Sequence, residues 1–193
     1  MVGGMMNIRC RLIFFIAAFP VLVACDNSQK ADNNSFERAL QSYYDVHPIC
    51  AVIPVTFPIP VDGLGTTTVK RQMDPLVSAG LVKADASGYS LTSAGEKVIR
   101  KGTDKFLGGT DVCFAKRKVV KIETFTAPAD AMGRKISSVT YDYALKDVEP
   151  WATDPKMADA FPQIGKALAK PGDRVTDILV LTTDGWKHEH DIR

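Results

Sequence analysis

A short apolar run near the start of the chain is the strongest constraint on the fold, because it separates an N-terminal segment from the sequence that can form a folded domain. Arg9 and Arg11 precede the run Leu12–Ala24, and polar sequence follows it. A helix of these 13 residues would be roughly 20 Å long, whereas the hydrocarbon core of a bilayer is about 30 Å thick. Pro20 also interrupts the run. This layout is typical of a secretory signal and is too short for a membrane span.

The apolar run ends in Leu22-Val23-Ala24-Cys25, which resembles the lipobox of bacterial lipoproteins. The resemblance implies acylation of Cys25 and removal of residues 1–24 as a signal peptide. Two or three acyl chains anchor a protein stably without a transmembrane helix. We therefore expect a protein held on the periplasmic face of a bacterial membrane, and Asp26 favours the inner membrane over the outer one. The alternative is an ordinary signal peptide with an incidental Cys25.

The sequence after Cys25 begins as a polar segment and continues with ordinary apolar content. Residues 25–35 have no apolar periodicity and predict a flexible, lipid-anchored tether. Removing Arg9 and Arg11 with the signal leaves equal numbers of acidic and basic side chains. The remaining chain is long enough for one sizeable domain or two small ones.

Basic residues concentrate in the middle of the chain. Residues 64–121 contain 11 Lys and Arg but 5 Asp and Glu. Such a region can face anionic head groups or another polyanion. The candidate contacts for an anionic surface are Lys70, Arg71, Lys83, Lys116, Arg117 and Lys118. The simpler alternative is a solvated surface without a dedicated partner.

Two cysteines remain once Cys10 leaves with the signal and Cys25 is lipidated. In an oxidising compartment this isolated pair, Cys50 and Cys113, predicts a disulfide. The alternative is a pair of buried free thiols. A redox site is not predicted, because the chain has no Cys-x-x-Cys motif.

The first part of the folded chain predicts mainly helix. Ser35 can cap a short helix over 36–44, and four prolines make 47–60 an extended segment. Residues 66–101 predict a helix, a hairpin with its turn at 85–88, and a second helix through Arg100. Thr92 or Ser93 opens this second helix, and Ser93 with Glu96 is a candidate capping box.

Part of this segment resembles the winged-helix modules of bacterial regulators. The resemblance is carried by Leu76–Val82, which matches the end of a recognition helix, and by Tyr89–Gly95, which matches the close of a wing. It implies phosphate contacts by Lys70, Arg71 and Lys83. Because the segment follows an export signal, we expect a scaffold or protein-binding module rather than a DNA-binding one.

Gly108-Gly109 suggests a boundary between a winged-helix-like subdomain, 36–107, and a second subdomain, 108–193. In the second, 117–126, 135–145, 175–182 and 186–189 predict strands. Asp154 and Pro155 open a single helix that ends at residues 170–172. The fold class is therefore α+β, with a β-β-α-β-β antiparallel sheet and one helix on a face. This half is similar to uncharacterised proteobacterial lipoproteins.

The one local cluster of candidate metal ligands lies at the end of the chain. On a strand, His188 and His190 would share one face and could hold a transition metal with a carboxylate from elsewhere. The simpler interpretation is a frayed polar tail. No serine nucleophile motif, phosphate-binding glycine loop or zinc spacing is present in the sequence.

These observations favour a non-enzymatic, membrane-anchored envelope protein that binds a partner protein or the anionic membrane surface and needs no cofactor. The first alternative is a periplasmic metal-binding protein or enzyme that uses His188 and His190. The second is a winged-helix nucleic-acid binder, which requires the signal interpretation to be wrong.

Overall fold

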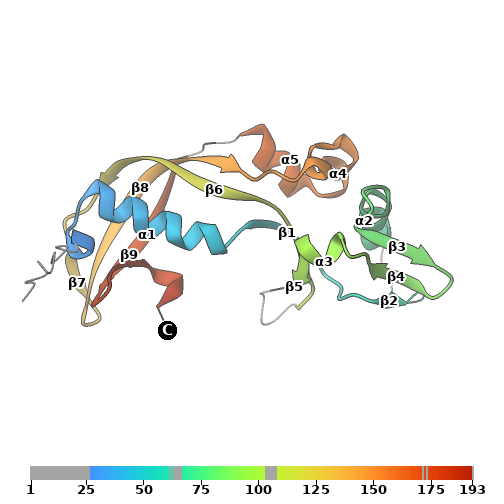
Figure 1. Cartoon of the computed structure of the whole chain (residues 1–193), viewed down its shortest axis with the longest axis horizontal. Coiled ribbons are helices and arrows are strands. Elements are labelled where there is room, and N and C mark those ends of the chain that lie inside the picture. Colours follow the sequence, from blue (N-terminus) through green and yellow to red (C-terminus); the bar gives the residue numbers. More distant parts are fainter. Residues whose placement is uncertain are drawn as a thin grey trace, which may run out of the picture.

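A computed structural model describes most of the chain that follows the predicted anchor. The described residues are 27–60, 62, 67–102, 108–170, 172 and 174–192. Cys25 and Asp26, the predicted lipidation and sorting residues, lie outside them. The described chain mixes helix with a curled antiparallel sheet (Figure 1), in agreement with the coarse fold class.

The larger sheet has seven strands, and every paired neighbour runs antiparallel. Its order is β1-β6-β8-β9-β10, while β5 pairs with β6 and β7 with β8. The strands are β1 (Ile49–Ile53), β5 (Ile99–Lys101), β6 (Thr110–Phe125), β7 (Ala129–Ala131), β8 (Arg134–Lys146), β9 (Arg174–Thr182) and β10 (Gly185–His188). The alternation predicted for 135–145 is confirmed on the core side, because Val139 and Tyr141 are fully buried.

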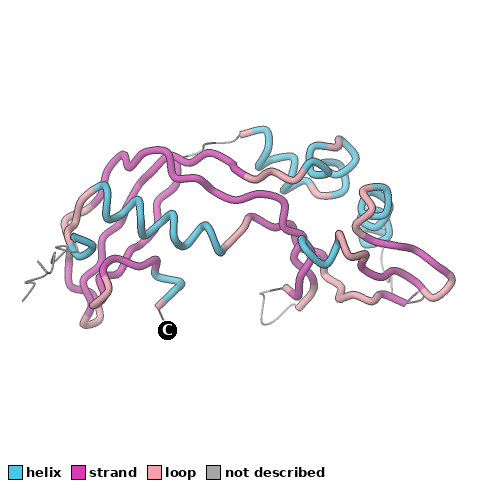
Figure 2. Tube along the Cα trace, viewed as in Figure 1, coloured by secondary structure: helices cyan, strands magenta, loops and turns pink. Residues whose placement is uncertain are grey.

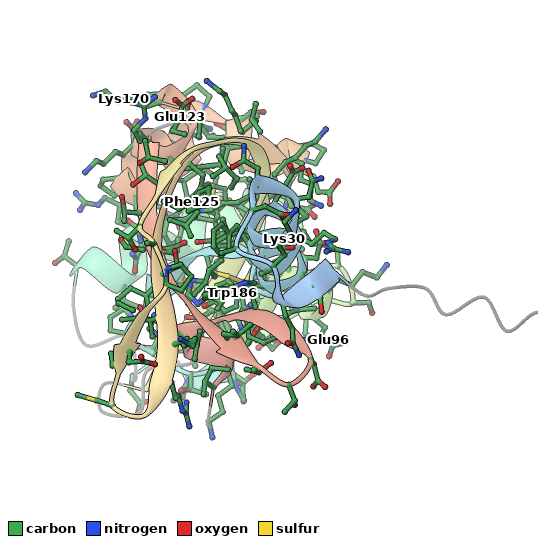
Figure 3. The ribbon with its side chains drawn as sticks, turned by 90° about the vertical axis from the view of Figure 1, so that its left-hand side faces the viewer. Lys30, Glu96, Glu123, Phe125, Lys170 and Trp186 are labelled. Atoms are coloured by element: carbon green, nitrogen blue, oxygen red, sulfur yellow. A yellow bond between two sulfur atoms is a disulfide. The ribbon has the colours of Figure 1, made fainter. Side chains whose placement is uncertain are left out.

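Helix α1 (Asn33–Val46) crosses this sheet and forms a first core with it. The Asp32 side chain caps the helix by accepting from the Ser35 N–H, one turn earlier than predicted. Phe36 and Leu40 are fully buried against the sheet. Trp186 is buried in this layer, whereas Phe125 is 38% exposed; both are labelled in Figure 3, and both rings meet Phe36 edge-on. We call this cluster the α1 core.

A second core lies at the other end of the molecule, where Figure 2 shows most of the shorter helices. It joins β1, β5 and β6 to α2 (Thr67–Ser78), η3 (Pro150–Thr153), α4 (Pro155–Ala160) and α5 (Pro162–Ala169). A three-stranded sheet, β2 (Ile59–Pro60), β4 (Gly88–Leu91) and β3 (Val82–Asp85), completes this end, and α3 (Gly95–Val98) leads from it to β5. We call this cluster the α2 core.

Two helices differ from the prediction for identifiable reasons. The single helix expected after Asp154 is divided into α4 and α5 at Phe161, which leaves the helical region because Pro162 follows it. The helix expected through Arg100 ends at Val98, since Ile99–Lys101 pairs with β6 instead. Of the two residues predicted to open this helix, Thr92 has the hydroxyl that accepts from the Gly95 N–H.

The flexible tether predicted for 25–35 is corrected over the described residues 27–35. Asn27–Gln29 forms the 3-10 helix η1, and Gln29 Nε2 donates to the Thr183 carbonyl at 2.9 Å. Residues 33–35 already belong to α1, and Ser35 is buried. Polar composition concealed this order, because the contacts come from the distant β9–β10 hairpin.

The two predicted subdomains, 36–107 and 108–193, share their packing. Strands β1 and β5 precede residue 108, yet both pair with β6. Helix α1 also precedes it and packs on β6 and β10. Long-range strand pairing, which no local pattern reveals, joins the two segments. Within the described part of the chain, no helix is long and apolar enough to cross a membrane.

Candidate functional site

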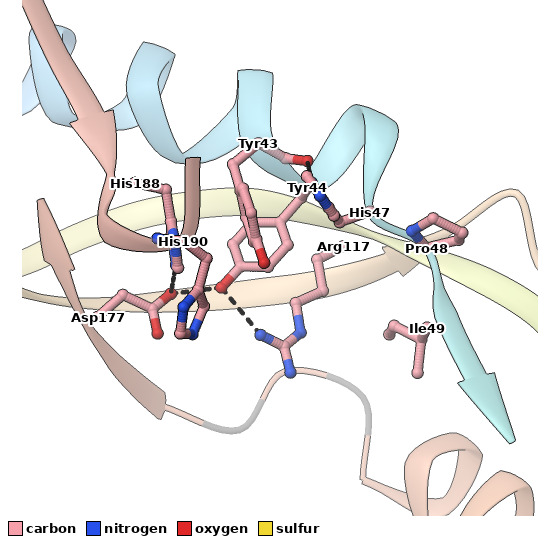
Figure 4. Close-up of a pocket in the computed structure, with 9 residues that line it drawn as sticks. All are labelled: Tyr43, Tyr44, His47, Pro48, Ile49, Arg117, Asp177, His188 and His190. Carbon is pink, nitrogen blue, oxygen red and sulfur yellow. Dashed lines mark hydrogen bonds and ion pairs between the residues drawn. The ribbon is translucent and has the colours of Figure 1, made fainter. Parts of the chain in front are cut away.

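The candidate site is a pocket of about 280 Å³ at the C-terminal end of α1. Tyr43 and Tyr44 come from α1, and Arg117 and Asp177 come from β6 and β9. The chain end adds His188 and His190 (Figure 4). The lining is completed where α1 passes into β1, by His47, Pro48 and Ile49. Segments far apart in sequence therefore supply the lining.

Gln41 fixes α1 against β6 next to this pocket. Strand β1 covers β6 only as far as Ala115, so beyond it no described strand pairs with β6 on that side. The Gln41 side chain takes that place: its Nε2 donates to the Arg117 carbonyl at 3.2 Å, and its Oε1 accepts from the Val119 N–H at 3.0 Å. The helix is thereby held in register with Arg117.

Asp177 is the centre of a hydrogen-bond network on the floor of the pocket. Its Oδ2 accepts from the Tyr44 hydroxyl, and the Tyr141 hydroxyl lies 2.6 Å from the same oxygen. The two phenol oxygens are also 2.6 Å apart. Tyr44 and Tyr141 are buried at 5% and 0% exposure, so these phenols satisfy one another and the carboxylate inside the α1 core.

His188 completes the network from the chain end. Its Nδ1 accepts the backbone N–H of His190 at 3.2 Å, and its Nε2 lies 3.5 Å from Asp177 Oδ2. With Nδ1 an acceptor, the ring proton is on Nε2 and points to the carboxylate. The ring stacks on Tyr43 at 3.7 Å between centroids, while His47 stacks on Tyr43 at 4.0 Å.

Arg117 supplies the positive charge of the pocket. Its Nη1 donates to the Tyr44 hydroxyl at 3.0 Å, and its guanidinium lies 4.9 Å from the ring centroids of Tyr44 and Tyr143. Its Nε is buried and has no hydrogen-bond partner among the described residues. No carboxylate of the described chain lies within ion-pair distance of it.

The pKa values of these groups follow from burial and hydrogen bonding. Burial alone would raise the pKa of Asp177, but hydrogen bonds from His188, Tyr141 and Tyr44 lower it to about 2. Burial and the bond to Asp177 raise the pKa of Tyr44 to about 12 and that of Tyr141 further above its ordinary value. The carboxylate is therefore ionised and both phenols are protonated over the whole neutral range.

The two histidines predicted at the chain end do come together, with ring centroids 5.2 Å apart. The strand ends at His188, and the 3-10 helix η4 (Glu189–Asp191) positions His190. The polar-tail interpretation is wrong for His188, which is 3% exposed. Both of its nitrogens already have partners, and no group of three His, Cys, Asp or Glu side chains among the described residues is placed to hold a metal ion.

The six basic residues predicted to face an anionic surface occupy different places. Lys70 and Arg71 lie on α2 and Lys83 on β3, all exposed, at one end of the molecule (Figure 1). Lys118 is exposed on β6, and Lys116 is 3.8 Å from Asp147. Arg117 lines the pocket instead of joining them.

Cys50 and Cys113 form the predicted disulfide, which links paired residues of β1 and β6. It lies in the strand pair that connects the two ends of the molecule. The alternative of two free thiols is therefore not the arrangement in this structure.

Sequence reasoning missed Tyr43, Tyr44, Tyr141 and Asp177 as site residues. Two signals were present: adjacent tyrosines at the end of an amphipathic helix, and a single acid inside the apolar strand 175–182. An acid in such a strand needs partners if it faces the core. Those partners lie 133 and 36 positions away in the sequence, so no local pattern names them.

Comparison with known proteins gives no family for this chain: no protein-family model, no curated protein and no solved structure matches it.

Proposed function

We propose that this chain is an exported bacterial lipoprotein, anchored through Cys25, whose folded part is a non-enzymatic binding module with the α1 pocket as its site. The resemblance of Leu22–Cys25 to a lipobox supports the anchor. The disulfide between Cys50 and Cys113 supports an oxidising compartment such as the periplasm.

The observation that carries the binding function is the preformed pocket with its closed network around Asp177. General acid–base catalysis works best with groups whose pKa lies near the working pH. Asp177, with a pKa of about 2, and Tyr44, with a pKa of about 12, are far from neutrality on either side. These groups are suited to holding a ligand in place, and we assign them no proton-transfer role.

The anchor and the fold together position the domain. Cys25 is two residues before Asn27, where the described fold begins, and two extended residues span at most about 7 Å. The lipid would therefore hold η1 and the β9–β10 hairpin close to the membrane surface.

The segment from α2 to α3 is, in this proposal, a winged-helix-like scaffold with no nucleic-acid role. Helix α2 leads into β3, β3 and β4 form a hairpin, and Thr92 ties the following turn to the Gly80 carbonyl at 2.6 Å. Its exposed basic residues, Lys70, Arg71 and Lys83, make this end the candidate surface for an anionic partner in the envelope.

The experiment compares full-length wild type with Cys25→Ala, and uses Cys10→Ala as the matched control inside the signal. We expect wild type and Cys10→Ala to lose 24 residues, gain acyl mass and remain with membranes, whereas Cys25→Ala does none of these. Mass spectrometry and membrane fractionation measure the result. Full-length, unacylated wild type in the cytoplasm would overturn the anchor and make DNA binding by the α2–α3 segment the next test.

A further inference from the structure

The pocket contains two groups of opposite charge whose hydrogen-bonding capacity the described fold leaves partly unused. Arg117 gives one Nη1 proton to Tyr44, and no described residue accepts from its Nε or Nη2. Asp177 receives Tyr44, Tyr141 and His188 at Oδ2, while no described donor reaches its Oδ1. Both residues line the same cavity.

The Tyr44 hydroxyl sets the separation of the two charges, since it contacts Arg117 Nη1 and Asp177 Oδ2 together. In Figure 4 the second oxygen of Asp177 and the guanidinium of Arg117 point to the same side, and the exposed His190 also lines the pocket. The guanidinium contacts the rings of Tyr44 and Tyr143. The carboxylate accepts from the hydroxyls of Tyr44 and Tyr141. Both charges are therefore preorganised, which lowers the entropic cost of binding.

A ligand with a single charge is poorly matched to this site. An anion on Arg117 would lie beside the uncovered oxygen of Asp177, and a cation at Asp177 would face the guanidinium. A ligand that carries both charges meets each group with its complement. Its carboxylate can accept from the guanidinium, which favours planar oxyanions, and its ammonium can donate to Asp177 Oδ1.

We infer that the pocket binds a free α-amino acid with a small apolar side chain. Pro48 and Ile49 supply an apolar wall for that side chain. The volume of about 280 Å³ is at the lower end for ligand pockets, so the ligand is small. His47 and His188 stack on Tyr43 and occupy the ring that an aromatic side chain would need. The inference rests on the proposed binding function of the pocket and does not depend on the lipid anchor.

The first test compares three ligands on the wild-type full-chain product, purified in mild detergent. Leucine carries both charges, 4-methylpentanoate lacks the ammonium, and 3-methylbutylamine lacks the carboxylate. Isothermal titration calorimetry should show saturable leucine binding at least about tenfold tighter than that of either analogue, because each loses one charge-assisted hydrogen bond. Absence of saturable leucine binding, or equal affinity for the three ligands, would overturn the inference.

Variants then assign the two charges. Asp177→Asn should weaken leucine at least about tenfold while 4-methylpentanoate binds equally or more tightly, and Arg117→Lys should weaken both ligands. Arg174→Lys is the matched control, since that arginine is exposed and paired with Asp142 and Glu123; its affinities should equal those of wild type. Thermal unfolding identifies any variant that fails to fold, and the wild-type ligand comparison then decides alone. The mass of the same sample reports the anchor, so the two proposals can fail separately.

Discussion

The α1 core and the α2 core use the same kinds of apolar side chain but differ in what else they bury. The α2 core packs aliphatic and aromatic residues from β1, α2, α4 and α5, and the polar residues buried at that end, Gln72, Thr110 and Asp111, are not part of a network around the candidate pocket. The α1 core adds Tyr44, Tyr141 and His188, which surround the carboxylate of Asp177. The pocket lies where these polar groups reach the surface, so the difference separates the part that stabilises the chain from the part that can recognise a ligand.

Truncating one buried phenylalanine in each core should give the largest loss of stability and tests whether the two cores are separate. Phe36 in the α1 core and Phe161 in the α2 core are both fully buried, so Phe36→Ala and Phe161→Ala should each lower the free energy of unfolding by about 3–5 kcal/mol. Urea unfolding measures this loss. Only Phe36→Ala should also shift the NMR signals of the His188 ring; an equal shift in Phe161→Ala would show that the two cores are not separate.

Removing the disulfide tests the connection between the two cores. The bridge joins residues separated by 63 positions, so Cys50→Ala with Cys113→Ala should lower the free energy of unfolding by up to about 4 kcal/mol on the chain-entropy argument. Denaturant unfolding of the double variant measures it. Thiol labelling of the unreduced protein should leave both cysteines unmodified, and full labelling would contradict the bridge.

Neutralising Asp177 tests the polar network. Asp177→Asn takes the charge from the acceptor of two phenols and a histidine, and should lower the free energy of unfolding by about 2–3 kcal/mol. Asp142→Asn is the control on the surface of the same sheet. Its partner Arg174 is exposed and solvent screens the pair, so we expect a clearly smaller loss than in Asp177→Asn. Equal losses in chemical denaturation would mean that the network around Asp177 stabilises the fold no more than an ion pair on the surface does.

The pH dependence of stability also tests the contribution of Asp177. The pKa of Asp177 is lowered to about 2 in the folded chain from an ordinary value of 3.8, so its contribution is present above about pH 4 and is lost as the pH falls toward 2. The loss from this group should be about 2 kcal/mol. Asp177→Asn should unfold with a correspondingly shallower acid dependence. Parallel acid profiles for the two proteins would assign the dependence to other carboxylates.

Much of the secondary structure follows from local sequence. The alternation of 135–145 predicts β8, the apolar run 175–182 predicts β9, and Asp154 with Pro155 predicts the start of α4. In each case the signal is a periodicity or a cap within a few residues. The predicted helix after Asp154 was too long because Pro162 acts at Phe161, a local effect that the apolar stripe obscured.

The sequence alone predicts some residues of the candidate site, but it places them in other roles. The sequence predicts Arg117 at a basic surface, and His188 in a metal pair or a frayed tail. Their actual neighbours are Tyr44, which lies 73 positions before Arg117, and Asp177. A side chain cannot be placed in such a pocket before the pairing of β6, β8 and β9 is known, because that pairing decides which residues share a face.

The sequence by itself determined the signal-like N-terminus, the mixed fold class, most helices and strands, and the two cysteines available for a bridge. Only the tertiary structure decided that α1 lies on the C-terminal sheet, that η1 packs on the β9–β10 hairpin, and that His188 is buried beside Asp177. The reason is physical: periodicity and caps act over a few residues, whereas burial of a charged network depends on side chains that only long-range strand pairing brings together.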